Sequence, residues 1–430
     1  MRVLVYPHDL AIGGSQLNAI ELAAAVNDRG HPTMVFGRPG PLVRRVEELG
    51  LRFIAAPEPG RRPSRSVISA LADVARREHI DVLHGYEWPP GLETWLSRGR
   101  LGPATASVTT VMSMAVAPFL PRSVPLVVGT EQIAAAERQR GRHRVVVIEP
   151  PVDLRENDPG QPVIDGHYLA RVGPRREDEL RITAVCRLAH ELKLEGLLTA
   201  IEVIGDLALE RPVRMIVAGD GPARQSIAER AGVVNARTGR ETIVLVGEMQ
   251  DPRCAYLDAD VVLGMGGSAL RALAFAKPLV VQGEQGFWAL LTPATLPDFQ
   301  WTGWYGVGVH PADGAVALRR ALVPLLDDPG RRRKLGAFGR AVVEERFALT
   351  TAAEAQIRLY EAALAAGGRG PLAGLVELAR VGSTFGAYVV TKKARRLFGG
   401  HTSEDFNRHP VASGGPARRP GGGEVARVET

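Results

Sequence analysis

The sequence predicts an α/β protein with two doubly wound parallel-sheet domains and a basic C-terminal tail. Apolar strand-like runs alternate with amphipathic helical stretches from the first residues onward, which is typical of parallel sheets covered by helices. A stretch rich in Pro, Gly and charge interrupts this alternation at 154–180, and the alternation restarts at 181. A length of 430 residues also suits two domains. We therefore predict an N-terminal domain at 1–158, a linker region at 159–180, a C-terminal domain at 181–366 and a tail at 367–430.

Composition narrows the functional classes. Apolar residues make up 45% and charged residues 23%, which are ordinary globular values, whereas aromatic residues at 5% argue against a base-stacking surface for nucleic acid. Residues 371–430 contain nine Lys/Arg and five Asp/Glu, so this tail holds +4 of the net charge of +6. The basic character therefore belongs mainly to the tail, and we predict no nucleic-acid partner.

The cysteines and the N-terminus indicate a cytoplasmic protein. Cys186 and Cys254 lie in separate segments and show neither metal-binding nor redox spacing, so we expect reduced thiols and no bound metal. Residues 1–6 form a strand-like run that leads directly into a turn, unlike a secretory signal. No segment approaches the length of a membrane span.

The first half supplies two groups of candidate residues. We predict strands at 3–6, 33–36, 53–55, 81–84, 104–109, 126–130 and 145–148, with helices near 15–29, 41–49, 66–79 and 90–98. After the first strand, Gly13 and Gly14 either bind a sugar or diphosphate through backbone N–H groups or simply begin a helix. After the fourth strand, His84 and Glu87 either orient a polar acceptor or, for His84, serve as a hydrogen-bonded structural residue.

The second half repeats the pattern with two cations at the end of its first strand. Strands are predicted at 181–186, 215–218, 243–246, 259–263 and 279–281, and helices at 314–326, 329–345 and 350–366. Arg187 ends the first of these strands and Lys193 begins the next helix. At a strand end that faces an interdomain crevice they suit a nucleotide diphosphate; otherwise they are solvated surface charges.

A glycine-rich turn follows the strand at 259–263. Gly264, Gly266, Gly267 and Ser268 would leave backbone N–H groups free for an anion. With Ser268 as the N-cap, Arg271 would stand at N3, where a cation opposes the helix dipole; it either clamps phosphates or extends to solvent. Glu284, in a loop after the next strand, either accepts a ligand hydroxyl or is a turn residue.

In their order and spacing, several short motifs resemble the family-four glycosyltransferases over roughly residues 1–366. These motifs are Gly13-Gly14-Ser15-Gln16, Pro150-Pro151-Val152-Asp153, Cys186-Arg187-Leu188 with Lys193, Val217-Ala218-Gly219-Asp220-Gly221-Pro222, the segment 270–281 and Val343-Glu344-Glu345-Arg346-Phe347. The resemblance implies a GT-B fold, in which two Rossmann-like domains face a cleft. It also implies metal-independent, retaining transfer of a sugar from a nucleotide-sugar co-substrate, with no further cofactor. Arg187 and Lys193 would then hold the donor diphosphate and stabilise the leaving group, and the N-terminal domain would bind the acceptor.

The sequence departs from the family at three places. Arg271 and Leu263 stand where the family usually has glutamates, and Met112 or a neighbour stands where it often has a histidine. Arg271 cannot accept hydrogen bonds from ribose hydroxyls, so we expect it to add a contact to the phosphates, with Glu284 supplying an acceptor. Two hypotheses follow: a glycosyltransferase acting on a glycan, lipid-linked or small-molecule acceptor, or a non-catalytic GT-B protein that binds a nucleotide sugar or supports a partner glycosyltransferase.

The tail leaves two interpretations open. Residues 371–398 mix apolar positions with Lys392, Lys393, Arg395 and Arg396. This pattern fits either a basic amphipathic helix at the inner membrane face, which would suit a lipid-linked acceptor, or a loosely ordered solubilising tail. From Gly399 onward the composition predicts disorder.

Overall fold

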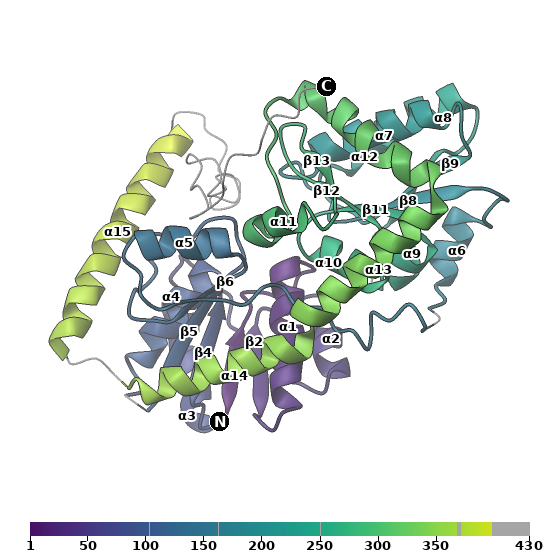
Figure 1. The fold of residues 1–430 in the computed structure, drawn as a ribbon. Coiled ribbons are helices and arrows are strands. Elements are labelled where there is room, and N and C mark those ends of the chain that lie inside the picture. The colour runs from purple at the N-terminus through teal and green to yellow at the C-terminus, as the bar shows by residue number, and fades with distance from the viewer. Residues whose placement is uncertain (103, 162, 250, 368–370, 398–430) are drawn as a thin grey trace.

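The computed structural model describes residues 1–102, 104–161, 163–249, 251–367 and 371–397, and it contains two parallel-sheet domains (Figure 1). The N-terminal sheet has the order β3-β2-β1-β4-β5-β6-β7, and all its strands are parallel. Its elements are β1 (Val3–Tyr6), α1 (Gly14–Asn27), β2 (Thr33–Gly37), α2 (Val43–Glu48), β3 (Arg52–Ala55), α3 (Arg65–Arg77), β4 (Val82–Tyr86), α4 (Trp88–Arg98), β5 (Ala106–Val111), β6 (Leu126–Val128), α5 (Glu131–Gln139) and β7 (Val145–Val147).

The C-terminal sheet has the order β10-β9-β8-β11-β12-β13, in which β13 alone pairs antiparallel. Its elements are α6 (Gly166–Val172), β8 (Leu180–Val185), α7 (Leu194–Leu207), β9 (Val213–Ala218), α8 (Arg224–Thr238), β10 (Ile243–Gly247), α9 (Arg253–Asp258), β11 (Val261–Gly264), α10 (Gly267–Ala274), β12 (Leu279–Gln282), β13 (Trp288–Leu290), α11 (Leu296–Thr302), the 3-10 turn η1 (Pro311–Asp313), α12 (Gly314–Asp327) and α13 (Pro329–Arg346).

Two helices lie in a different domain from the one that the sequence suggested. The helix α14 (Leu349–Ala365) returns to the N-terminal domain, where Tyr360 and Ala363 join the core that contains α1 and β1. The helix α6 lies inside the predicted linker region, but Tyr168 and Val172 are buried in the C-terminal core. The amphipathic pattern of a helix indicates that one face is buried, but it does not indicate which domain covers that face.

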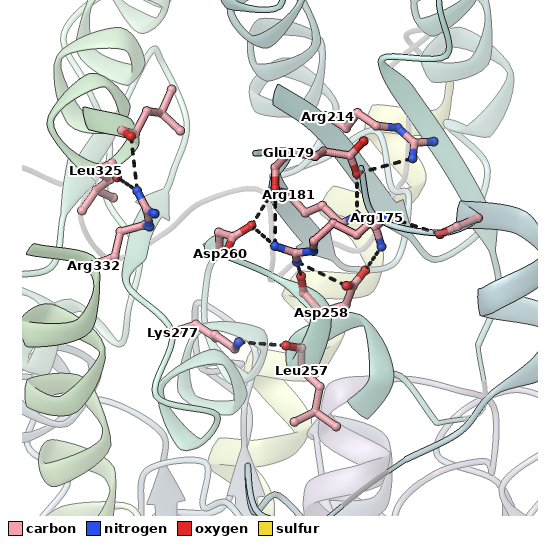
Figure 2. Close-up of polar contacts among 12 residues, drawn as sticks. Arg175, Glu179, Arg181, Arg214, Leu257, Asp258, Asp260, Lys277, Leu325 and Arg332 are labelled. Carbon is pink, nitrogen blue, oxygen red and sulfur yellow. Dashed lines mark hydrogen bonds and ion pairs between the residues drawn. The ribbon is translucent and has the colours of Figure 1, made fainter. Parts of the chain in front are cut away.

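The amino edge of the C-terminal sheet is tied together by buried ion pairs (Figure 2). The Arg181 guanidinium is 3% exposed and donates to Glu179 at 2.7 Å and to Asp258. Arg175 joins Asp258 to Asp260, which also accepts the Arg181 backbone N–H at 2.8 Å. This network lies at the starts of β8 and β11, so it fixes the sheet from the edge opposite the candidate site.

The carboxyl edges of the two sheets face each other. Thr130 follows β6, and its methyl group lies so close to Gly303, at the end of α11, that an added Cβ there would overlap it. Arg271, in the helix after β11, donates to Glu21 of α1 at 3.1 Å. The residues that follow the strands of each domain therefore meet at one boundary, the place where open α/β sheets bind ligands.

The last helix, α15 (Pro371–Leu397), lies along the outer side of the N-terminal domain beside α4 and α5 (Figure 1). The helical interpretation of this part of the tail is confirmed. The disorder expected from Gly399 onward falls outside the described residues. No helix among the described ranges is both long and apolar enough to cross a bilayer.

Candidate active site at the domain boundary

The loop between β8 and α7 carries Arg187 and is fixed by the neighbouring turn after β9. The Leu188 backbone N–H donates to the Asp220 carbonyl at 2.9 Å, and the Leu188 carbonyl accepts the Ala223 N–H at 2.8 Å. These bonds hold the two loops side by side at the carboxyl edge of the sheet. The position of Arg187 therefore depends on the turn at 219–222.

Two glycines make this close approach possible. Gly219 has φ +142° and Gly221 has φ +152°, conformations that residues with a Cβ rarely adopt. An added Cβ at Gly219 would overlap the Cys186 carbonyl oxygen, and one at Gly221 would overlap that of Leu188. Gly219 and Gly221 thus allow the turn after β9 to pack directly against the loop after β8.

Arg187 and Lys193 are cations that form no ion pair with any described carboxylate. The Arg187 side chain is exposed, and Lys193 is half-buried at the N-cap of α7. Burial lowers the pKa of the Lys193 ammonium. Within the described residues, neither side chain forms an ion pair with a carboxylate. A partly buried cation that lacks a carboxylate partner is unfavourable, so this edge is suited to an anion.

A second loop, at 283–286, lies beside the start of α7. The Glu195 carboxylate accepts the backbone N–H groups of Gln285 at 3.2 Å and Gly286 at 2.6 Å. Half-buried Glu284 accepts the hydroxyl of Tyr305. The sequence analysis did not identify Glu195 or Tyr305. Glu195 could have been found, because it lies two residues after Lys193 in the first turn of a helix.

The glycine-rich turn begins α10 differently from the prediction. Gly264 ends β11, Gly266 is the N-cap with φ +55°, and Gly267 is the first helical residue. Ser268 lies inside the helix, and its hydroxyl donates to the Met265 carbonyl at 2.9 Å. The placement of Ser268 as N-cap is therefore wrong, because glycine at 266 adopts the left-handed conformation that this turn needs.

This shift moves Arg271 out of the first helical turn. Arg271 lies in the last turn of α10, where a cation does not oppose the helix dipole. Its guanidinium donates to Glu21 of the other domain, and the two side chains are only 24% and 12% exposed. Arg271 therefore connects the domains and already has an anionic partner.

On the N-terminal side, a carboxyl group lies where three loops meet. Gly13 is the N-cap of α1 and Gly14 its first residue. Glu87, directly after β4, accepts the Ser15 hydroxyl at 3.1 Å, the Met112 N–H at 2.9 Å and the Ser113 hydroxyl at 2.7 Å. Burial raises the pKa of Glu87 despite these bonds. The Ser15 hydroxyl thus brings the start of α1 beside Glu87 at the sheet edge, and the contact of Gly13, Gly14 and Glu87 with an acceptor stays a prediction.

His84 does not belong to this site. Its ring is fully buried, with Nδ1 2.7 Å from the Tyr360 hydroxyl and Nε2 2.7 Å from the Thr110 hydroxyl. Burial lowers its pKa to about 3. Strand β4 continues two residues past His84 to Tyr86, so the histidine points into the layer between the sheet and α14. The predicted acceptor role of His84 is wrong.

The described residues contain no group of three or more His, Cys, Asp and Glu side chains placed to hold a metal ion. The boundary is thus lined by cations, backbone N–H groups and isolated carboxyls.

Two parallel-sheet domains whose carboxyl edges face each other define the GT-B fold of glycosyltransferases. Solved structures with 12–16% identity share this fold, among them a glycosyltransferase from Rickettsia africae, which has 16% identity and a TM-score of 0.66 over 84% of this chain and 98% of its own. HepE of Anabaena, solved with UDP and glucose, has 14% identity and a TM-score of 0.62 over 83% of this chain and 98% of its own.

WaaG, a glycosyltransferase of lipopolysaccharide biosynthesis, has 14% identity and a TM-score of 0.56 over 82% of this chain and 98% of its own. The trehalose-6-phosphate synthase OtsA has 14% identity and a TM-score of 0.57 over 84% of this chain and 99% of its own. No known family model matches the sequence, and no curated protein does. The structural likeness therefore defines the fold, and the site must supply the argument for function.

Proposed function

We propose that this protein is a glycosyltransferase that moves a sugar from a nucleotide-sugar donor to a glycan, lipid-linked or small-molecule acceptor. The proposal includes retention of the anomeric configuration, independence from metal and a cytoplasmic location. The observation that carries it is that Arg187, in the loop after β8, and Lys193, at the N-cap of α7, form no ion pair within the described part of the chain. The GT-B fold and the nucleotide complexes of HepE support this choice of ligand.

The proposed chemistry is electrostatic. As the bond between the sugar and the diphosphate breaks, negative charge develops on the departing phosphate oxygen. A guanidinium and an ammonium already held at that place stabilise this charge without having to reorganise. Because Lys193 is half-buried, water screens its charge less than on an open surface.

The other candidate residues complete the donor side. Backbone N–H groups at the turn of Gly264 and Gly267 would donate to the remaining phosphate or sugar oxygens. The Gly266 N–H, which was predicted to be free, already donates to the Trp304 carbonyl at 3.0 Å, and Ser268 would add little because its hydroxyl donates to the Met265 carbonyl. Glu284 would accept a ribose hydroxyl. Arg271 is assigned to the domain contact instead, because Glu21 already occupies its guanidinium.

The acceptor side rests on Glu87. It lies beside Gly13 and Gly14, after β4, and burial raises its pKa, which favours the protonated carboxyl that can donate as well as accept a hydrogen bond. It would orient the attacking hydroxyl, and closure of the domains would align the two substrates.

One observation favours the second hypothesis, a non-catalytic protein that binds a nucleotide sugar or supports a partner enzyme. The positions where the resembled family has glutamates carry Leu263, which is buried in β11, and Arg271, which is paired with Glu21. Neither side chain can accept a hydrogen bond from a ribose or sugar hydroxyl as a glutamate does. Under this hypothesis the nucleotide binds but no sugar is transferred.

Calorimetric titration with UDP, GDP, ADP and their glucose conjugates tests the proposal. We expect one nucleotide to bind and Arg187→Ala to weaken it at least tenfold, because a charge-assisted hydrogen bond contributes about 1.5–3 kcal/mol. Arg333→Ala, which removes an exposed arginine from α13, is the matched control and should leave binding unchanged. Absence of binding at millimolar nucleotide would remove the donor site.

Turnover separates the two hypotheses. With the nucleotide identified, its sugar conjugate is incubated with acceptor panels, and release of the free nucleoside diphosphate is measured with and without EDTA. Acceptor-dependent release supports the enzyme, and NMR of the product's anomeric proton tests retention. Tight binding without transfer to any acceptor favours the non-catalytic hypothesis.

A further inference from the structure

The helix α15 is fixed to the N-terminal domain along one side only. The Glu377 carboxylate accepts the backbone N–H groups of Arg122 and Ser123, the latter at 3.3 Å. Arg380 donates to the Leu120 carbonyl at 2.8 Å. The helix therefore stays in a defined orientation on the domain.

Aromatic contacts extend this attachment toward the candidate site. The Tyr388 ring lies 5.0 Å from Phe119 and 6.1 Å from Trp88, measured between ring centroids. Phe385 lies 5.1 Å from Phe119. Trp88 directly follows Glu87, so the C-terminal half of α15 lies next to the edge proposed to bind the acceptor.

The helix α15 lies at the outside of the N-terminal domain (Figure 1), and the side chains that it exposes include many apolar ones. The large apolar ones, with their exposed fractions, are Leu372 at 76%, Leu375 at 63%, Val376 at 64%, Leu378 at 49%, Val389 at 45% and Val390 at 69%. At residues 372–391 no charged side chain is exposed. At 1.5 Å per residue this uncharged face is about 30 Å long. Its large apolar side chains lie near both ends, and the exposed residues between them are the small Ala379, Gly382, Ser383, Gly386 and Ala387. Exposed apolar surface of this kind marks an interaction site.

The end of the same helix is strongly basic. Four of the five residues 392–396 are Lys or Arg, and Lys393 is exposed. An apolar face that ends in a cluster of cations is the pattern of helices that lie in the headgroup region of anionic membranes. The helix does not meet the requirements for a membrane span.

We propose that the outward face of α15 binds an anionic lipid bilayer, with the apolar side chains inserted among the acyl chains and the cations at the phosphates. Charge complementarity favours lipid over a second copy of this chain. The only acidic residue at 371–397 is Glu377, which is buried and paired with Arg380. Two copies packed through this face would bring the basic ends together or against an uncharged segment.

This surface also selects among acceptors, a consequence that rests on the proposed function. Trp88 packs on the inward side of α15, so a bilayer on the outward side would lie about one helix diameter, ~10 Å, from Trp88 and the adjacent Glu87. A lipid-linked acceptor could then reach the domain boundary without leaving the membrane.

Vesicle co-sedimentation of the full-length protein tests the docking without any nucleotide, so its outcome does not depend on the proposed function. Vesicles of phosphatidylcholine are compared with vesicles containing 30% phosphatidylglycerol, at low and high salt. We expect binding to the anionic vesicles that weakens with salt. The variant Val376→Glu/Val390→Glu should reduce the affinity at least tenfold, because it places two carboxylates in the apolar face.

The matched control is Leu209→Glu/Val233→Glu, which adds the same charges at positions 60% and 59% exposed in the C-terminal domain, and it should bind as the unmodified protein does. Lys393→Glu should weaken binding, whereas Lys334→Glu, on exposed α13, should not. Circular dichroism verifies folding of each variant. Absence of binding, equal binding to neutral vesicles, or equal loss in the control would overturn the proposal, as would dimers in lipid-free solution that Val376→Glu/Val390→Glu disrupts.

Discussion

The ion pair between Arg271 and Glu21 gives a sharp test of how the two domains are held together. Arg271→Gln and Glu21→Gln each replace a charged side chain with the neutral amide side chain of glutamine. The double variant completes a thermodynamic cycle, whose coupling energy isolates the pair. We predict that the pair stabilises the domain contact and takes no part in nucleotide binding.

The geometry of the pair allows an estimate of its coupling energy. The two side chains approach to 3.1 Å and are 24% and 12% exposed. Two unit charges about 4 Å apart attract by about 4 kcal/mol at an effective dielectric constant of 20. Solvent reaches part of the pair, and desolvation of both groups offsets more of this energy, so we expect a coupling of about 1–2 kcal/mol.

Burial raises the pKa of Glu21, and nearby Arg45 counteracts this effect together with Arg271. Glu21 therefore keeps a second cation when Arg271 is replaced, whereas Arg271 has no second carboxylate in direct contact among the described residues. We accordingly expect Glu21→Gln to destabilise the protein at least as much as Arg271→Gln.

Urea unfolding followed by circular dichroism measures the coupling, and calorimetry measures nucleotide affinity in the same variants. The affinity should change by less than about twofold in all three, since the pair contributes equally to the free and bound states. The reasoning is refuted if Arg271→Gln weakens nucleotide binding tenfold while Glu21→Gln does not. That result would place Arg271 on the donor phosphates.

Two further predictions concern a buried histidine and a turn glycine. Because burial lowers the folded-state pKa of His84 to about 3, from an ordinary value of 6.5, the unfolded chain takes up the proton first; stability should fall by about 1 kcal/mol from pH 7 to 5.5. In His84→Gln this contribution disappears. Urea unfolding at the two pH values measures it, and an equal loss of unfolding free energy in the unmodified protein and in His84→Gln would contradict the prediction. Gly219→Ala should destabilise the protein and weaken nucleotide binding, because its Cβ displaces the loop of Arg187. Gly232→Ala, in open space on α8, should leave binding unchanged in the same titration.

Most of the fold follows from the sequence because each central strand is a short apolar run with helical stretches on both sides. Residues 3–6, 243–246 and 279–281 lie within the strands β1, β10 and β12. The strand β13 was missed since Trp288–Leu290 has three residues at an antiparallel edge, too few for a periodic signal. The return of α14 to the first domain was missed because it depends on contacts between residues nearly 300 positions apart, such as Tyr360 and His84.

For the candidate site, the sequence could predict only which residues lie at the ends of strands. The residues after a parallel strand must lie at the carboxyl edge, and this rule placed Arg187, Glu284 and Glu87 correctly. It failed for His84 because a strand that continues two residues further carries the side chain into the core. It also could not reveal that Arg271 reaches Glu21, since that contact depends on how the two domains are oriented.

The contrast between Arg271 and Lys193 supports a ligand at the domain boundary. Arg271 is half-buried at the boundary, and the chain supplies Glu21 to compensate it. Lys193 is half-buried in the same region with a lowered pKa, yet among the described residues no carboxylate pairs with it. A protein stabilised by its own contacts alone would gain from a carboxylate beside Lys193, as it does beside Arg271. The absence of that carboxylate is expected if an anionic group of a bound molecule takes its place during each binding event.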